Sequence, residues 1–308
     1  LMSGYQLKTP VAFMVFNRPE VTKRVFAEIA KAKPPILLVI ADGPRSNHPD
    51  DAEKCADVRA IIDGVDWDCE VLTNYSNVNM GCKHCPPNGL DWVFDLVEEA
   101  IVLEDDCLPH PTFFRFCEEL LEKYRNDERI AMISGNNFQF GKKRTRYSYY
   151  FSRYPHLWGW ASWRRAWKDY DAQMKIWPEI RDGGWLQDIL GDKKIVRYWK
   201  KLIENTYQGK IDSWDYPWVL ACWIQNKLTI LPNVNLVSNI GFGSEAVHTK
   251  VRNKFAEIET ETMRFPLLNP DYLLRDSKAD FFVENKMFSG KSVILRVLNI
   301  VINKLKGI

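Results

Sequence analysis

The residues best suited to chemistry are three consecutive carboxylates, Glu104, Asp105 and Asp106, in the segment IVLEDDCLPHPTFFRF (101–116). They follow directly on three aliphatic residues typical of a buried strand, where mutual repulsion and desolvation both disfavour negative charge. A bound cation removes that objection, because magnesium and manganese commonly take one or two carboxylates together with phosphate oxygens and water. Without a cation, the same acids are typical of a solvated loop or of the first turn of the following helix.

Buried strands and amphipathic helices alternate over the first 135 residues, and these elements must position the acids. Strands that are apolar on both faces and separated by helices predict a parallel α/β sheet. In such sheets ligands collect beyond the carboxyl ends of the strands, where Arg18, Asp42 and the acidic run all stand. Apolar runs predict strands within 11–16, 36–44, 69–74 and 101–106, and helical spacing predicts helices near 21–33, 50–65, 89–100 and 112–124.

The second half of the chain differs in composition, because ten of the twelve tryptophans fall between Trp158 and Trp223. The alternation of strands and helices also fades there. No Gly-, Ser- or Pro-rich spacer precedes this half, so we expect a lobe packed against the sheet and not a linker-joined domain.

The overall composition is that of an ordinary globular protein, with 308 residues, 46% hydrophobic and 27% charged, and a net charge of +2. The basic residues are spread along the chain, which argues against a nucleic-acid partner. Seven cysteines, an odd number, predict reduced thiols and a cytoplasmic location. The pair Cys82 and Cys85 forms a CxxC that fits free thiols better than a zinc site.

No apolar run reaches the about 20 residues that a membrane span needs. The tail 291–308 places Val293, Val297, Val301 and Leu305 on one helical stripe among basic residues. We expect such a helix to dock on the protein or on a partner. The alternative is contact with the anionic inner face of a membrane, as a peripheral anchor.

The segment 101–127, IVLEDDCLPHPTFFRFCEELLEKYRND, resembles the metal-binding segment of GT-A nucleotide-sugar glycosyltransferases. It is most similar to the Golgi N-acetylglucosaminyltransferase I family and to a bacterial group of hemolytic-protein-like sugar transferases. The resemblance covers about residues 10–250 and implies a GT-A, Rossmann-like fold: a mixed, mainly parallel sheet flanked by helices, with a Trp-rich acceptor-side lobe. It implies that Asp106 binds Mn²⁺ or Mg²⁺ directly, and that Glu104 and Asp105 lie against the ribose or sugar of the donor.

Two further strand ends share this resemblance. In VFNRPEV, Arg18 takes the place of an arginine that reaches the nucleotide. In IADGP, Asp42 takes the place of an aspartate that accepts a hydrogen bond from uracil. The family also has a basic residue ahead of the helix before the metal strand, for which NMGCKHCPP offers Lys83 or His84.

The second half carries the residues that the resemblance links to catalysis. The segment KIDSWDYPWVLACW resembles the family's Trp-Asp segment, which makes Asp215 the catalytic base of an inverting transfer. Taken alone, Asp215 is typical of a helix N-cap or first-turn acid before a proline. The flat apolar faces of tryptophan suit sugar rings. Most tryptophans in a protein belong to its core, so we expect about two of five candidates to contact sugar. The candidates are Trp158, Trp160, Trp163, Trp214 and Trp218.

The segment NLVSNIGFGSEAVHT (235–249) resembles the C-terminal loop of many GT-A enzymes. There Ser238 is the candidate contact to the diphosphate and His248 the candidate metal ligand, since neutral imidazole suits manganese. A surface histidine without such a role is the alternative for His248. Gly241 and Gly243 are expected to let the loop close over the donor and exclude water.

The sequence therefore predicts a metal-dependent, inverting glycosyltransferase that moves a sugar from a UDP-sugar, UDP-GlcNAc as first candidate, to a hydroxyl of a glycan or glycolipid acceptor. One alternative is a nucleotidyltransferase that makes an activated sugar, although no Gly-rich phosphate loop follows the first strand. Another is a non-catalytic carbohydrate-binding module. The expected division is a leader or tag at 1–9, a nucleotide-sugar-binding half at 10–139, a catalytic, acceptor-side half of the same domain at 140–250, and a C-terminal extension at 251–308.

Overall fold

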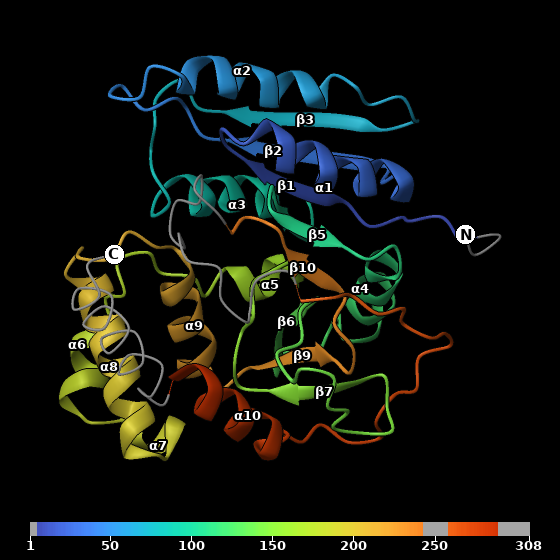
Figure 1. Ribbon diagram of the computed structural model, residues 1–308. Coiled ribbons are helices and arrows are strands. Elements are labelled where there is room, and N and C mark those ends of the chain that lie inside the picture. Colours follow the sequence, from blue (N-terminus) through green and yellow to red (C-terminus); the bar gives the residue numbers. More distant parts are fainter. Residues whose placement is uncertain (1–4, 243–257, 289–308) are drawn as a thin grey trace, which may run out of the picture.

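The computed structural model describes residues 5–242 and 258–288, and its centre is an eight-stranded sheet (Figure 1). The strands of this sheet are β1 (Val11–Val15), β2 (Ile36–Ala41), β3 (Glu70–Tyr75), β4 (Glu99–Glu104), β6 (Ile130–Ser134), β7 (Tyr149–Ser152), β8 (Trp160–Trp163) and β9 (Leu228–Pro232). Their spatial order is β3-β2-β1-β4-β8-β6-β9-β7. A separate two-stranded sheet pairs β5 (Cys107–Pro109) with β10 (Val237–Asn239) in antiparallel register.

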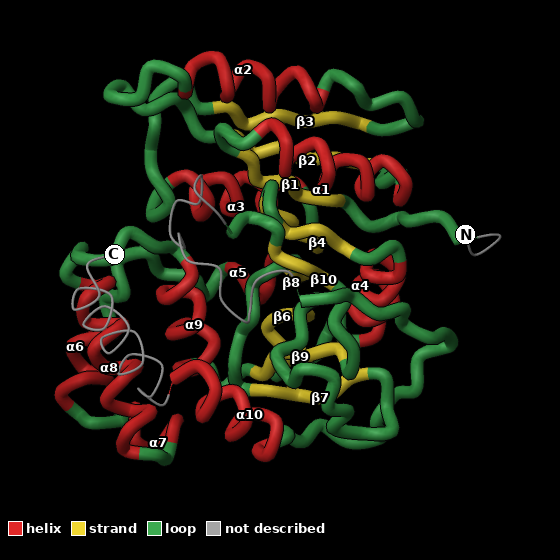
Figure 2. The backbone as a smooth tube through the Cα atoms, in the orientation of Figure 1, coloured by secondary structure: helices red, strands yellow, loops and turns green. Residues whose placement is uncertain are grey.

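Helices cover both faces of the large sheet, as the backbone tube in Figure 2 shows. One face is packed by α1 (Pro19–Ala32), α2 (Asp51–Ile62) and α4 (Thr112–Lys123), and the other by α3 (Cys85–Leu96), α5 (Arg164–Trp167) and α9 (Asp215–Ile224). A lobe beside α9 contains α6 (Trp177–Asp182), α7 (Leu186–Leu190) and α8 (Lys193–Tyr207). Helix α10 (Ser277–Val283) and the π-helical turn η1 (Glu284–Phe288) follow near β7 and α8.

The predicted fold class, a mixed and mainly parallel α/β sheet flanked by helices, is confirmed. Strand β1 pairs in parallel with β2 and β4, β2 pairs in parallel with β3, and β6 pairs in parallel with β9. Strand β8 runs antiparallel to both of its neighbours, β4 and β6.

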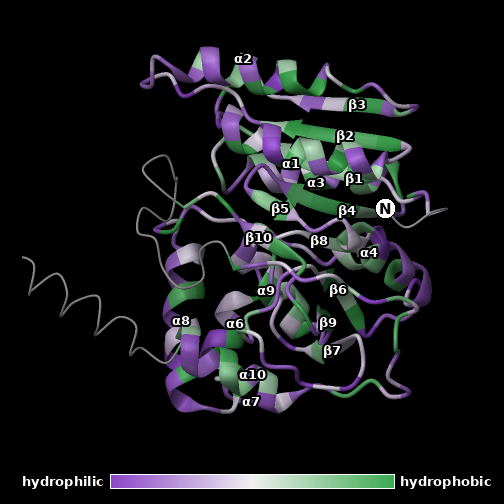
Figure 3. Ribbon diagram, turned by 45° about the vertical axis from the view of Figure 1, so that its right-hand side comes forward, coloured by the Kyte–Doolittle hydropathy of each residue, from purple (hydrophilic) through white to green (hydrophobic). Residues whose placement is uncertain are grey.

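The central strands form because their side chains are apolar on both faces, and both faces are covered by helices. Every residue of β1 is buried, with Phe13 facing α1 and α4 and Met14 facing α3. Figure 3 shows β2 and β4 as hydrophobic along most of their length, whereas the edge strand β3 carries hydrophilic segments. An edge strand with polar residues is consistent with its exposure to water.

The second half contributes more to the sheet than its sequence indicated. We expected a lobe packed against the sheet, but β7, β8 and β9 lie within it. Strand β8 is inserted between β4 and β6, so residues on either side of position 139 share one set of backbone hydrogen bonds. Its short, Trp-rich sequence WASW lacks the long apolar run that marks the earlier strands.

Helix α3 begins at Cys85, four residues before the predicted start at 89. The prolines at positions 86 and 87 occupy its first turn, where a missing N–H costs no hydrogen bond. The helix ends at Leu96, because the chain enters β4 at Glu99, two residues earlier than the predicted strand.

In residues 5–242 and 258–288, every helix is too short or too polar to cross a bilayer. The basic amphipathic tail predicted at 291–308 lies outside the described residues.

Candidate functional site

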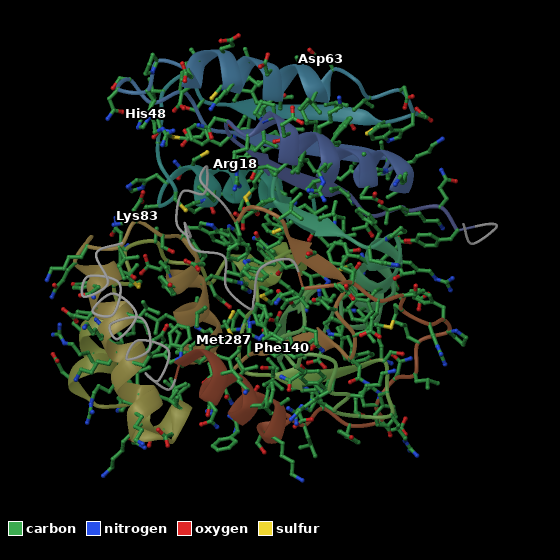
Figure 4. All side chains as sticks on the ribbon, in the orientation of Figure 1. Arg18, His48, Asp63, Lys83, Phe140 and Met287 are labelled. Carbon is green, nitrogen blue, oxygen red and sulfur yellow. The ribbon has the colours of Figure 1, made fainter. Side chains whose placement is uncertain are left out.

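The carboxyl ends of β1, β2 and β4 meet at one edge of the sheet and bring together residues far apart in the sequence. Met14 pairs with Glu104, and Val15 pairs with Ala41, so the segments that follow these strands are neighbours. Figure 4 shows Arg18 and Lys83 on the same side of the molecule, where the upper strands meet the helical lobe. The structure therefore assembles the predicted strand-end residues at one edge.

Arg18 forms ion pairs with two of the three acids. Its Nη1 lies 2.9 Å from Asp106 Oδ2, its Nε donates to Asp105 Oδ2 at 3.3 Å, and its Nη2 pairs with Asp105 Oδ1. Burial works against the charge on the guanidinium, but the two carboxylates outweigh it and raise the pKa of Arg18. Burial also raises the pKa of Asp105 to about 6, while Arg18 acts in the opposite direction.

Strand β10 encloses this cluster from the other side. Asn239 Nδ2 donates to Asp106 Oδ1 at 3.3 Å, and the Ile240 N–H donates to the Asp106 carbonyl at 2.8 Å. A Cβ at Gly241 would lie 2.2 Å from Asp106 Oδ2 and 2.7 Å from both Asp106 Cβ and Arg18 Nη1, so a larger residue there would displace the ion pair. The predicted role of Gly241 was loop closure, and no role was predicted for Asn239, because the sequence pattern predicted neither strand of the β5–β10 pair.

These contacts bear directly on the predicted metal site. Arg18 pairs with both oxygens of Asp105 and with Oδ2 of Asp106, and Asn239 donates to Oδ1 of Asp106. In this arrangement the two carboxylates cannot also coordinate a divalent cation. Within the described ranges, no group of three or more His, Cys, Asp or Glu side chains is arranged to hold a metal ion. The predicted ligand His248 and the predicted hinge Gly243 lie outside those ranges.

Glu104 is the last residue of β4 and, by alternation along the strand, shares the side of Val102, which packs in the tryptophan-rich cluster, whereas Leu103 packs on the other side. Burial raises its pKa well above the ordinary value, and the charges of Asp106, Asp105 and Asp215 add to the effect while Arg18 opposes it. Its environment therefore favours the protonated acid.

Asp215 is the first residue of α9 and is oriented by local hydrogen bonds. Ser213 Oγ and the Tyr216 N–H, the latter at 3.1 Å, both donate to its Oδ1. Its charge contributes to raising the pKa of both Glu104 and Cys82, after burial and nearer acids. Burial, followed by the charges of these acids, raises the pKa of Cys82 to about 12, so this thiol stays protonated at neutral pH. The sequence marked Cys82 only as part of a CxxC.

Asp42 holds the loop that follows β3. Its carboxylate accepts hydrogen bonds from the N–H groups of Gly43, Met80 and Gly81 at 2.8, 2.8 and 2.9 Å, and from Asn79 Nδ2 at 3.0 Å. A carboxylate has about four lone-pair positions, so these donors use its capacity. Recognition of uracil by Asp42 stays a prediction.

Lys83 continues the same loop toward α9. Its N–H donates to Asp212 Oδ1 at 2.9 Å, and Asp212 lies three residues before Asp215. This hydrogen bond joins the loop after β3 to the segment before α9. The predicted nucleotide-binding residue Lys83 and the predicted base Asp215 therefore belong to neighbouring segments. Ser238, the predicted diphosphate contact, is half-buried in β10 opposite Leu108.

Most of the tryptophans predicted to contact sugar are part of the core. Trp160, Trp214 and Trp218 are 0%, 3% and 1% exposed, and the Trp160 ring packs 6.1 Å from that of Trp214 and 6.2 Å from that of Trp218. Trp163 is also buried. Their burial in apolar surroundings accounts for them without a ligand.

Trp158 is the half-buried member of the set. Its ring meets Phe138 and Phe242 edge-on, at 5.1 and 5.8 Å between centroids. Phe242 follows Gly241, which packs on the Arg18 ion pair. Trp158 therefore lies near the acidic edge with part of its surface accessible.

No family model matches this chain, and no curated protein matches it. The solved structures similar to it include a mannosyltransferase from Pyrobaculum calidifontis in complex with GDP-Man and Mn²⁺, at 12% identity and a TM-score of 0.36, covering 52% of this chain and 45% of that one. The match thus spans less than half of the mannosyltransferase. Two structures of UDP-glucose pyrophosphorylase overlap at 13% and 11% identity, with TM-scores of 0.28 and 0.35 and coverage of 49% and 73% of this chain and 64% and 90% of theirs. At these scores the overlaps carry no argument about function.

Proposed function

We propose that this protein is a glycosyltransferase that moves a sugar from a UDP-sugar, with UDP-GlcNAc as the first candidate, to a hydroxyl of a glycan or glycolipid acceptor. The observation that supports it is the pairing of Arg18 with Asp105 and Asp106 at one edge of the sheet, together with the hydrogen bond from Lys83 to Asp212 that brings the segment before Asp215 to the loop after β3. Open α/β sheets bind their ligands at this edge.

The donor is proposed to lie over the ends of β1 to β4. Its nucleotide would contact the loop that Asp42 holds, and its diphosphate would face the cationic side chains of Arg18 and Lys83. An arginine recognises phosphate oxygens through paired N–H donors, which suits Arg18 to this role once a phosphate replaces a carboxylate as its partner. Ser238 of β10 is a further candidate contact to the diphosphate.

Asp215 is proposed to act as the base. It would accept the proton of the acceptor hydroxyl as the hydroxyl oxygen bonds to the anomeric carbon. The bond between that carbon and the diphosphate oxygen breaks in the same step, and its electron pair leaves with UDP. A single displacement of this kind inverts the anomeric configuration. Trp158 is the proposed platform for the acceptor sugar, because it is the partly accessible tryptophan of the set.

None of these steps uses Mn²⁺ or Mg²⁺. The carboxylate predicted to bind the ion, Asp106, is paired with Arg18, so the steps above use only residues of the chain.

The proposal is tested by incubating the purified chain with a panel of UDP- and GDP-sugars and glycan acceptors, and measuring release of the nucleoside diphosphate and mass gain of the acceptor. We expect UDP release that depends on the acceptor. A parallel incubation with sugar 1-phosphate and UTP measures pyrophosphate. Pyrophosphate formation without sugar transfer would make the protein a nucleotidyltransferase, and sugar binding that is indifferent to UDP would make it a carbohydrate-binding module.

A further inference from the structure

We infer that Arg18 is the resident cation of the acidic edge, and that it competes with a divalent ion for Asp106. The inference does not depend on the proposed transfer reaction, because it concerns cation binding alone. It explains how three acids can follow a buried strand when no group of side chains in the described residues is arranged around a metal.

The first observation is that Arg18 and a metal ion would need the same atoms. Arg18 Nη1 lies 2.9 Å from Asp106 Oδ2, and both oxygens of Asp105 face Nε and Nη2 of the same guanidinium. Magnesium requires carboxylate oxygens at about 2.0–2.1 Å in a nearly octahedral arrangement. A guanidinium and a divalent ion at the same oxygens would repel each other, and the buried site would screen this repulsion weakly.

The second observation is the enclosure of the pair. The backbone at Gly241 packs so closely that an added Cβ would clash with both Asp106 and Arg18. Asn239 Nδ2 meets the remaining oxygen of Asp106, at 3.3 Å from Oδ1. The space around Asp106 is therefore shaped for the arginine, with the backbone of β10 and the residues after it as its wall.

The third observation is that only the side chain of Arg18 needs to move for an exchange. Its carbonyl accepts hydrogen bonds from the Thr22 N–H at 3.0 Å and from Thr22 Oγ1 at 2.7 Å. Pro19 and the first turn of α1 follow directly, so the backbone is held by the helix. The guanidinium can leave the acids through side-chain rotation while β1 and α1 stay in place.

Competition has a measurable consequence. If the arginine-free state of the acids is populated for about one tenth of the time, the apparent affinity for a divalent ion falls about tenfold. Removal of the arginine would therefore raise the apparent affinity for the divalent ion by the same factor of about ten. A site designed for metal, with Arg18 as a supporting residue, would lose affinity on the same substitution.

The experiment measures Mn²⁺ binding to the full chain by electron paramagnetic resonance, without nucleotide. We expect R18Q to bind Mn²⁺ at least about tenfold more tightly than the wild type, and R18Q combined with D106N to lose that gain. The matched control is R45Q, which removes another arginine near the same sheet edge that pairs with Asp51. It should leave Mn²⁺ binding unchanged.

Equal or weaker Mn²⁺ binding by R18Q overturns the inference. If R18Q does not fold, R18K is measured instead, because lysine keeps a positive charge but cannot pair with Asp105 and Asp106 through a planar fork of donors. Tighter Mn²⁺ binding by R18K than by the wild type supports competition, and equal or weaker binding overturns it.

Discussion

Two regions of this molecule bury an arginine between acids, but the acids in the two regions have different hydrogen-bond and ion-pair partners. Arg18 lies between two aspartates after β4, and Arg153 lies between acids of α10 and η1. The two arginine side chains are similarly buried, at 16% and 12% exposure. Burial also raises the pKa of an aspartate in each group, Asp105 and Asp280, to about 6. Burial and pKa therefore do not by themselves distinguish a functional site from a structural one.

The partners around the arginine make the difference. In the network around Arg153, Ser152 Oγ donates to Asp280 Oδ1 at 2.5 Å, and Tyr154 OH donates to Glu284 Oε1 at 2.8 Å. Arg153 Nη2 lies 2.6 Å from the same glutamate oxygen. Each acid has both a cationic and a hydroxyl partner, so the network acts as a clamp that holds α10 and η1 against the sheet.

At the carboxyl edge, acids outnumber the arginine that pairs with them. Glu104 and Asp215 lie near the Arg18 pair and raise the electrostatic cost of ionising one another. Such an excess of acid is unfavourable for stability but suits proton transfer and cation binding. The comparison teaches that the two regions differ in their ratio of acids to cations and not in burial, and this excess of acid is the feature on which the proposed function of the edge depends.

The largest expected effect is a loss of transfer activity without a loss of stability, on substitution of the proposed base Asp215. Asp215→Asn should lower transfer by about 10²–10⁴, the range for loss of a general base, because asparagine cannot accept the hydroxyl proton. UDP affinity, measured by calorimetry, and the unfolding midpoint should stay near wild type. Asp182→Asn, at an exposed acid of α6, is the control. Normal turnover in Asp215→Asn would assign the base to another residue.

The opposite pattern is expected in the clamp. Glu284→Ala should lower the free energy of unfolding by about 3–5 kcal/mol, because it leaves a buried arginine short of a partner. Nucleotide affinity at low temperature should not change. Chemical denaturation of this variant, and of Glu122→Ala at an exposed ion pair, tests this. A loss of nucleotide binding without a loss of stability would contradict the contrast between the two regions.

A smaller effect is expected at Gly241, where the edge depends on close packing. Gly241→Ala should lower the free energy of unfolding by about 1–3 kcal/mol through overpacking against Asp106 and Arg18. Gly64→Ala serves as the control, since its added Cβ meets no described atom closer than 3.1 Å. If both variants unfold at the same denaturant concentration, the enclosure of the ion pair is looser than described.

An effect of similar size is expected in the pH dependence of the stability that the clamp contributes. Because the pKa of Asp280 is about 6 in the folded state and ordinary when unfolded, the folded protein binds the proton more tightly. Its contribution to stability is present below about pH 4 and is lost as the pH rises to about 6, an effect of about 1–3 kcal/mol. Asp280→Asn should flatten this part of the stability curve, measured by denaturant titration between pH 4 and 7. An unchanged slope would mean that Asp280 titrates normally.

The sequence was informative where local pattern and tertiary structure agree. Continuous apolar runs predicted β1, β2 and β4, and the positions of Arg18, Asp42 and the acids at strand ends followed from the parallel topology. The same patterns could not show that Arg18 contacts Asp105, since 87 residues separate them and an acid cluster attracts an arginine as readily as a metal. Nor could they place β8, whose tryptophans are typical of both sugar platforms and a core, a choice that only burial decides.

The position of β8 constrains how this molecule can be made. A nascent chain that has emerged only through residue 139 exposes the backbone donors and acceptors of both β4 and β6, which later pair with the same strand. Unpaired strand edges of this kind recruit other chains. The gap between β4 and β6 is filled only after Trp163 has left the ribosome, so we expect fragments that end before Trp163 to aggregate or to require chaperones, even though their own apolar strands are present.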